Sequence, residues 1–425
     1  MFRLVSWLPR DGIARNTLAI WVYQFGAMGI GLAISVTVAR YLGPERKGIV
    51  DLYLLLGALI GEFGLLGVSY GLVYYVANRK RPLDQAHAVA LAISVSFGIV
   101  IAGVGIATFG IWSPLIPGLE FRIAVLCLAI TPFAFYGRMW TNILTAIDRA
   151  VDIGRWTLVL TAASLIAVLI LFWKDALTPW TMIILLASIT VVTALVAAGD
   201  LFRRERGMRF DQQLARDCLR YGLLMYGTML ANFLHFKADQ FMVNYWLGRE
   251  PLAVYAVSVR WAELLFALDG AIVAASLARI AGADAKNRRS LTGRVTTAQA
   301  AIALSAALMI AAVAWPVIKL LYGDQFMGAV APLWVLIPGV TAWSIQKVPG
   351  TLLVYNMGRA KLIMVLAMIG AVMNIGLNLA ALEWTNLGIV GVAGASSISY
   401  IVVAALVLIY ARSAMKLADT PETAL

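Results

Sequence analysis

Nine ionisable side chains lie inside long apolar stretches of this sequence. A charge at bilayer depth costs about 2.5–3.5 kcal/mol on insertion scales, so such residues tend to face a ligand, a cavity or a partner. The acids in this set could carry a proton or a cation, and the bases could bind an anion. The set consists of Glu62, Arg138, His235, Lys237, Asp239, Arg260, Glu263, Asp269 and Lys347.

Arg138 and Lys347 are candidates for binding an anion. The chain contains an internal repeat, and its offset of 210 residues carries Arg138 to a position next to Lys347. The two bases are therefore expected at similar depth in two related halves, where they would repel each other across an apolar cavity unless an anion lay between them. A diphosphate is such an anion, because Arg offers it a bidentate fork and Lys a point charge. Alternatively, each base snorkels or pairs with an acid of its own half.

A second charged group lies on one predicted helical hairpin. Arg249 marks the tip of this hairpin. Lys237 is twelve residues before Arg249 and Arg260 eleven residues after it, so both are expected about 17 Å below the tip by helical rise. Asp239 lies near the same level, and His235 is level with Glu263. These charges could neutralise one another and hold the hairpin together. Lys237 points about 200° away from Asp239 around its helix, which makes it the better candidate for contact with a substrate.

Glu62 and Asp269 are acids at corresponding places of the repeat. An offset of 205 residues carries Glu62 to position 267, close to Asp269. Intramembrane acids carry protons or cations in transporters, although these two could equally be hydrogen-bonded packing groups. We therefore predict substrate contacts from the four bases Arg138, Lys347, Lys237 and Arg260. We predict coupling or gating roles for Glu62, Asp239, Glu263, Asp269 and His235.

The composition indicates an integral membrane protein. Hydrophobic residues make up 62% of the chain and charged residues 13%, against roughly 25% charged residues in soluble domains. Apolar stretches repeatedly reach the ~20 residues that cross a bilayer core. No cleavable signal peptide is expected. Neither Cys127 and Cys218 nor the two distant histidines suggest a disulfide framework or a metal site, and we expect no cofactor.

The apolar runs predict twelve spans, and the basic residues orient them. The loops of one side, with both termini, hold most of the Lys and Arg, which places them in the cytoplasm by the positive-inside rule. Basic clusters such as residues 203–209 suit anionic lipid headgroups rather than nucleic acid. The predicted spans are 17–39, 49–76, 86–111, 120–146, 156–173, 178–201, 219–246, 252–278, 296–318, 328–355, 362–382 and 388–411.

Two loops occur twice in the sequence. ARYLGPERKG (39–48) resembles NYWLGREPLAVY (244–255), and TAIDRA (145–150) resembles YNMGRA (355–360). Each pair of loops connects equivalent spans in the two halves. Because each half has six spans, an even number, the two halves keep the same orientation and are related by an axis along the membrane normal. The expected fold is an all-α polytopic membrane protein with twelve transmembrane helices in two pseudo-symmetric six-helix lobes around a central cavity.

The predicted divisions are an N-terminal lobe at 1–201, a basic cytoplasmic linker at 202–217, a C-terminal lobe at 218–412 and a cytoplasmic tail at 413–425.

Several motifs resemble one transporter family. They are the opening hairpin ARYLGPERKGIVDLYLLLGALIGEFGLLGVSYGLVYYVA, LYGDQFMGAVAPLWVL (321–336), MNIGLNLAA (373–381) and LGIVGVAGASSISY (387–400). Together they resemble Wzx-type polysaccharide flippases, which belong to the MATE-like multidrug/oligosaccharidyl-lipid/polysaccharide (MOP) superfamily. The resemblance implies a two-lobed inner-membrane carrier of undecaprenyl-diphosphate-linked sugars.

Four functions are compatible with a polytopic membrane protein of this kind. The favoured one is a flippase that moves a lipid-linked oligosaccharide across the inner membrane by alternating access, alongside a polysaccharide polymerase and glycosyltransferases. A MATE-like drug/cation antiporter predicts an acid-dominated cavity, whereas Arg138 and Lys347 are bases. A peptidoglycan-precursor flippase is chemically close but typically has extra spans. A membrane glycosyltransferase would show acidic motifs in a sizeable soluble loop, and the basic linker has none, so we expect no enzyme.

Overall fold

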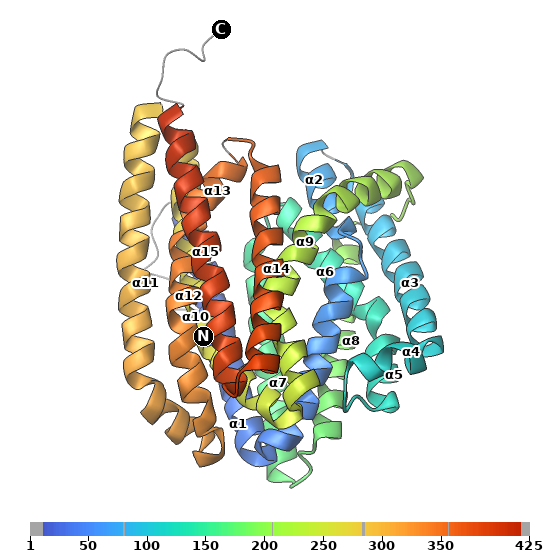
Figure 1. The fold of residues 1–425 in the computed structure, drawn as a ribbon. Coiled ribbons are helices and arrows are strands. Elements are labelled where there is room, and N and C mark those ends of the chain that lie inside the picture. The colour runs from blue at the N-terminus through green and yellow to red at the C-terminus, as the bar shows by residue number, and fades with distance from the viewer. Residues whose placement is uncertain (1–11, 80, 206, 283–284, 356, 418–425) are drawn as a thin grey trace. The chain divides into compact units, whose positions relative to one another are not determined.

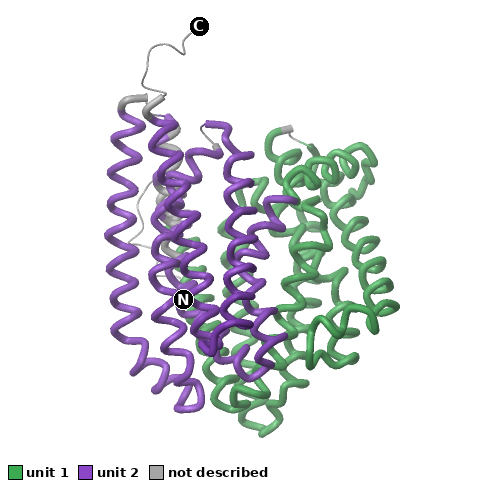
Figure 2. The backbone as a smooth tube through the Cα atoms, viewed as in Figure 1, with its two compact units in different colours: residues 1–226 green, residues 227–425 purple. Residues whose placement is uncertain are grey.

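A computed structural model of the chain describes residues 12–79, 81–205, 207–282, 285–355 and 357–417. All regular structure in these ranges is helical. A helix satisfies its backbone hydrogen bonds within one segment, which is what a chain in lipid requires. The chain divides into two compact units between residues 226 and 227; the described residues up to 226 form unit 1 and those from 227 onward form unit 2, coloured separately in Figure 2.

The helices are labelled in Figure 1. Unit 1 contains α1 (Gly12–Phe63), α2 (Val68–Arg79), α3 (Leu83–Ala107), α4 (Phe109–Trp112), the 3-10 turn η1 (Ser113–Leu115), α5 (Phe121–Ala129), α6 (Thr131–Ala146), α7 (Ala150–Trp173) and α8 (Pro179–Arg204). Helix α9 (Gln212–Leu247) begins in unit 1 and continues into unit 2. Unit 2 then contains α10 (Arg249–Ala281), α11 (Ala285–Tyr322), the 3-10 turn η2 (Asp324–Ala329), α12 (Val330–Ile345), α13 (Lys347–Tyr355), α14 (Ala360–Trp384) and α15 (Gly388–Leu417).

The helices account for the twelve predicted spans. Eight helices in the described ranges are long and apolar enough to cross a membrane, and the bent pair α5–α6 makes up to nine. One of the eight, α1, holds two predicted spans because Gly43 (φ 72°, ψ 172°) breaks it. Helices α9 and α10 are longer than a bilayer requires, and they carry the intramembrane charges that lower their hydropathy.

Both repeated loops contain a residue with positive φ at the equivalent position in each unit. The aligned glycines Gly43 and Gly248 both have positive φ, at 72° and 94°. In the second pair, Asp148 (φ 58°) aligns with Gly358 (φ 64°). A positive φ reverses the chain at a helix end, where glycine adopts it without strain. The internal duplication predicted from the sequence is thus visible in the backbone.

Small residues set the close packing of helices in each unit. In unit 1, a Cβ on Gly98 of α3 would lie 2.6 Å from the Cα of Pro132 in α6. In unit 2, a Cβ on Gly339 of α12 would lie 2.4 Å from the Cα of Ser397 in α15. Because lipid is as apolar as a side chain, helices in membranes associate through such close contacts. These close contacts fix the position of α6, which carries Arg138, and of α12, which ends two residues before Lys347.

Candidate functional site

Arg138 lies on the second half of a broken span. Helix α5 ends at Ala129 and α6 begins at Thr131, with a bend of 42° between them. Pro132 in the first turn of α6 has no amide hydrogen, so the helical hydrogen bonds of α5 cannot continue through it. The bend therefore follows from the sequence. The bend gives α6 its own direction and brings Arg138, two turns along, to the end of α1.

Arg138 pairs with Glu62 in unit 1. One terminal nitrogen, Nη2, lies 2.6 Å from Oε2 of Glu62, and the other, Nη1, donates to the carbonyl of Gly61 at 3.3 Å. Since α1 ends at Phe63, the Gly61 carbonyl is one of the helix-end acceptors without an intrahelical donor. The side chains of Arg138 and Glu62 remain 33% and 21% exposed. Arg138 therefore has a partner in its own half, and part of its guanidinium stays accessible.

Lys347 occupies the equivalent place in unit 2. It is the first residue of α13, after the break at Gln346 that separates α13 from α12. Its ammonium lies over the ring of Trp343, 5.3 Å from the centroid. It also interacts electrostatically with Asp269 of α10. Among the described residues no carboxylate oxygen lies within 4 Å of its nitrogen, so this pairing is looser than that of Arg138.

Asp269 is buried at the junction of three helices. Its Oδ1 accepts a hydrogen bond from the hydroxyl of Ser344 in α12 and a longer one, 3.4 Å, from Nε2 of Gln299 in α11. The same Gln299 nitrogen donates to the backbone carbonyl of Ser344 at 2.7 Å. Ser344 and Lys347 are three residues apart across the break, so the contact with Ser344 brings Lys347 toward the same carboxylate.

Lys237 pairs with Glu263, a partner that the predicted depths of the two residues did not indicate. Nζ of Lys237 on α9 lies 3.1 Å from Oε1 of Glu263 on α10, and the two side chains are 29% and 37% exposed. Arg260, one turn earlier on α10, is exposed. This pair links α9 and α10, and part of each side chain stays exposed.

Asp239 belongs to a buried hydrogen-bond network instead. Its Oδ2 accepts from the hydroxyl of Tyr255 at 2.6 Å and from Ser396 of α15 at 3.2 Å, and its Oδ1 accepts from the backbone NH of Gln240. Asn374 of α14 donates to Ser396 at 3.1 Å. Hydroxyl and backbone NH donors from α9, α10 and α15 thus hold this carboxylate.

His235 joins the same network through Ser399. Its Nε2 lies 3.0 Å from the Ser399 hydroxyl, and Asn374 donates to that hydroxyl at 3.2 Å. Asn378 in turn donates to Asn374 at 2.9 Å. His235, Asn374, Asn378 and Ser399 are all fully buried. Within the described ranges no three His, Cys, Asp or Glu side chains come together as a metal site.

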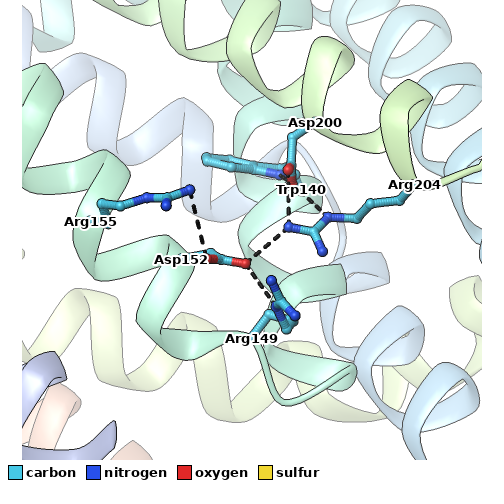
Figure 3. A network of polar contacts seen from close by, with 6 residues as sticks. All are labelled: Trp140, Arg149, Asp152, Arg155, Asp200 and Arg204. Atoms are coloured by element: carbon cyan, nitrogen blue, oxygen red, sulfur yellow. Dashed lines mark hydrogen bonds and ion pairs between the residues drawn. The ribbon is translucent and has the colours of Figure 1, made fainter.

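A polar cluster that sequence reasoning missed ties three helices of unit 1 together (Figure 3). Asp152 of α7 pairs with Arg149 at 2.8 Å and with Arg204 of α8 at 2.9 Å. Arg204 also pairs with Asp200 at 3.0 Å, and Asp200 accepts from the indole of Trp140 on α6, again at 3.0 Å. The i,i+4 spacing of Asp200 and Arg204 was the available signal. Because Trp140 lies two residues after Arg138, the cluster fastens the helix that carries Arg138.

The helices define a multi-pass membrane protein with the MATE/MOP transporter fold. The chain is similar to the inward-facing conformation of a multidrug resistance MATE family transporter of the MOP superfamily, with 17% identity, a TM-score of 0.76, and 93% of this chain and 96% of that chain covered. It is also similar to the outward-facing conformation of such a transporter, with 17% identity, a TM-score of 0.69 and 97% of both chains covered. MATE transporters have twelve transmembrane helices in two lobes, as predicted for this chain.

A third similar structure is a MOP superfamily transporter from Pyrococcus furiosus, with 14% identity, a TM-score of 0.66 and 96% of both chains covered. The reversed polarity of that transporter's binding pocket suggests a different function for it. No curated protein matches the sequence. The family model "Polysaccharide biosynthesis protein" matches residues 37–331. The chain belongs to this family of polysaccharide biosynthesis proteins, as the sequence motifs predicted.

Proposed function

We propose that this protein is a flippase that moves an undecaprenyl-diphosphate-linked oligosaccharide across the inner membrane by alternating access, with both termini in the cytoplasm. The family supports a role in polysaccharide biosynthesis, and the fold supports a membrane transporter. A lipid-linked repeat unit is a substrate that a membrane transporter acting in polysaccharide biosynthesis would carry. Glycosyltransferases would supply this substrate, and a polysaccharide polymerase would consume it.

The observation that carries this proposal is that a base and an acid occur at matching places in the two units, in direct contact in unit 1 and more than 4 Å apart in unit 2. Arg138 pairs with Glu62, and Lys347 interacts with Asp269. A base held by an acid can exchange that acid for a diphosphate without ever being left unpaired at depth. This suits a carrier that must bind and release its anion. We propose that Arg138 and Lys347 contact the diphosphate, and that Lys237 and Arg260 contact the polar headgroup.

The acids and the buried histidine are proposed to control this exchange. Glu62 and Asp269 compete with the anion for the bases, and Glu263 does so for Lys237. Asp239 and His235 lie in the buried network that joins α9, α14 and α15. A change in the charge of either would alter the packing of those helices, which is a gating role.

The test is binding and translocation of a prenyl-diphosphate sugar by purified variants in proteoliposomes. Arg138→Ala and Lys347→Ala should each abolish transport while the protein still reaches the membrane. Arg138→Lys should restore part of it, because the charge returns without the bidentate fork. Arg122→Ala is the matched control, since that arginine is 65% exposed and pairs with neighbouring Glu120. Full activity in both alanine variants would refute the proposed anion contacts.

A drug/cation antiporter is the competing function, because the similar solved structures include multidrug transporters. It predicts that a cationic dye is exported and that Arg138→Ala leaves this export intact. A peptidoglycan-precursor flippase shares the diphosphate and would be recognised by translocation of that precursor in preference to other lipid-linked sugars.

A further inference from the structure

Arg149 and Arg155 lie beside a buried carboxylate in the cluster drawn in Figure 3. Asp152 is 8% exposed, and its Oδ2 accepts hydrogen bonds from Nε of Arg149 at 2.8 Å and from Nη2 of Arg204 at 2.9 Å. Nη2 of Arg155 lies 3.8 Å from the other carboxylate oxygen, too far for a hydrogen bond. Arg204 is also engaged by Asp200, through Nε and Nη2. One carboxylate therefore holds three guanidiniums, and the protein does not use the three equally.

Most hydrogen-bond donors of Arg149 and Arg155 have no acceptor among the described residues. A guanidinium has five donors, of which the side chain of Arg149 uses one and that of Arg155 none. The two side chains are 52% and 57% exposed, against 22% for Arg204. The three arginines also outnumber Asp152 and Asp200 by one charge. Two accessible, planar guanidiniums with an excess of positive charge suit the oxygens of a phosphate, which arginine binds in bidentate fashion.

Arg155 begins an exposed apolar face of α7. At about 100° per residue, Val159, Ile166 and Ile170 lie within about 60° of Arg155 around the helix. These three side chains are 50%, 59% and 50% exposed, and α7 is one of the helices long and apolar enough to cross a membrane. In a bilayer such a face contacts acyl chains. The ring of Trp156, whose centroid lies 5.8 Å from Cζ of Arg155, is of the kind that marks the boundary between headgroups and acyl chains. Arg155 therefore lies where a lipid headgroup meets its acyl chains.

Unit 2 has the same loop without this cluster. Arg359 aligns with Arg149 in the repeated loop, and both residues precede their helix with similar backbone angles (φ −88°, ψ 35° and φ −108°, ψ 36°). In unit 2 a leucine replaces Asp152, and Val365 replaces Arg155. Orientation in the membrane needs positive charge alone, to which an added carboxylate contributes nothing. A purely structural role explains Arg149, which donates a hydrogen bond to Asp152, but not Arg155, which donates none.

We propose that Arg149 and Arg155 bind the phosphate of an anionic phospholipid, whose acyl chains lie along the exposed face of α7. Asp152 holds the guanidiniums in place, which reduces the entropy lost on binding. Asp148, the acid before Arg149, is exposed to water and salt, which screen its charge. The proposed orientation assigns this lipid to the cytoplasmic leaflet, whereas the site itself does not depend on that orientation. Because the cluster reaches Trp140 on α6, a bound lipid should stabilise the packing of α6, α7 and α8.

The test compares two lipids that differ in headgroup charge. Dioctanoyl phosphatidylglycerol, added to the purified protein in a nonionic detergent, should raise its melting temperature, and dioctanoyl phosphatidylcholine should not. Arg155→Gln should weaken the apparent affinity for the anionic lipid about fivefold, which is the contribution of one basic residue near an anionic surface. Arg149→Gln/Arg155→Gln should lose most of the response. Arg359→Gln, at the equivalent place in unit 2, is the matched control and should respond as the wild type does.

Several results would overturn the proposal. An equal response to both lipids, an unchanged affinity in Arg155→Gln, or an equal loss in Arg359→Gln would each do so. A rise in melting temperature of the same size with inorganic phosphate would indicate a site for soluble anions instead. Tighter binding of geranyl diphosphate than of phosphatidylglycerol at these arginines would assign the site to the transported lipid, and would overturn the proposal too.

The Arg155 variants keep the test decisive if Arg149→Gln does not fold. Arg155 donates no hydrogen bond to a described residue, so Arg155→Gln should unfold at the temperature of the wild type when no lipid is added. Arg155→Lys keeps the charge without the planar fork and should bind phosphatidylglycerol with intermediate affinity. Failure of these expectations would leave the proposed contacts of Arg138 and Lys347 untouched, because neither residue takes part in this measurement.

Discussion

Glu62 should act as a competitor of the substrate for Arg138. Its carboxylate oxygen Oε2 lies 2.6 Å from Nη2 of the guanidinium. The Glu62→Gln variant keeps the size of the side chain and removes its charge. If the anion must displace Glu62, this variant should bind a prenyl diphosphate more tightly than the wild type does. If Glu62 merely stabilises the folded protein, anion affinity should stay the same or fall.

The size of the effect follows from the exposure of the pair. Two unit charges about 4 Å apart interact by about 4 kcal/mol at the effective dielectric constant of a protein surface. The side chains are 33% and 21% exposed, so solvent screening reduces this to about 1–2 kcal/mol. Every 1.4 kcal/mol is a factor of ten in affinity, so Glu62→Gln should lower the dissociation constant by about tenfold.

The assay is equilibrium binding of geranyl diphosphate to purified protein in detergent, with thermal unfolding measured in parallel. The expected result is tighter binding, a modest loss of melting temperature, and a lower transport rate because release of the anion is slowed. Glu120→Gln is the matched control, because that acid pairs with the exposed Arg122. Weaker binding in Glu62→Gln, with the protein still folded, would refute the displacement mechanism and leave Glu62 as a positioning group for Arg138.

Three further predictions test topology and packing. Thiols introduced near Pro44 and Arg249 should react with an impermeant reagent from outside and those near Arg209 and Arg288 should not; the opposite pattern would reverse the orientation. Gly370→Ala should lower stability by about 1–3 kcal/mol, because its Cβ would lie 2.6 Å from Cε1 of His235, whereas Gly376→Ala on the same helix meets nothing within 4 Å and should be neutral or stabilising in thermal unfolding. Tyr255→Phe should cost about 1–3 kcal/mol by leaving Asp239 short of a donor, and the exposed Tyr245→Phe should cost nothing measurable.

The spans and the repeat could be read from the sequence because they depend on local patterns. Apolar length identifies a membrane helix, and a Leu-Gly pair before an acidic residue marks a helix end in both halves. Gly43 and Gly248 accordingly share a positive φ. The bend before Arg138 could also be predicted from a local signal, because a single residue, Pro132, produces it.

The partners of the charges could not be read in the same way, because they depend on which helices touch. Depth along a hairpin placed Asp239 near Arg260, but depth does not give the direction of a side chain. Tyr255 and Ser396, the hydroxyl donors of Asp239, come from α10 and α15, and no pattern in the sequence relates them to Asp239. The Trp140–Asp200 contact likewise needs the packing of α6 on α8.

The two units hold the same combination of groups but hold them differently, and this difference bears on mechanism. In unit 1 the base and the acid are in direct contact and partly exposed, so an anion can exchange with Glu62 at modest cost. In unit 2 the acid is buried and its base lies over an aromatic ring, so engagement of Lys347 by an anion changes the charge balance of an enclosed carboxylate. If both bases bind one anion, as we propose, Arg138 does so by releasing Glu62, whereas Lys347 does so by leaving the ring of Trp343. The two halves of a duplicated site would then bind the same group at different cost, because only one of the two bases has to break a direct ion pair.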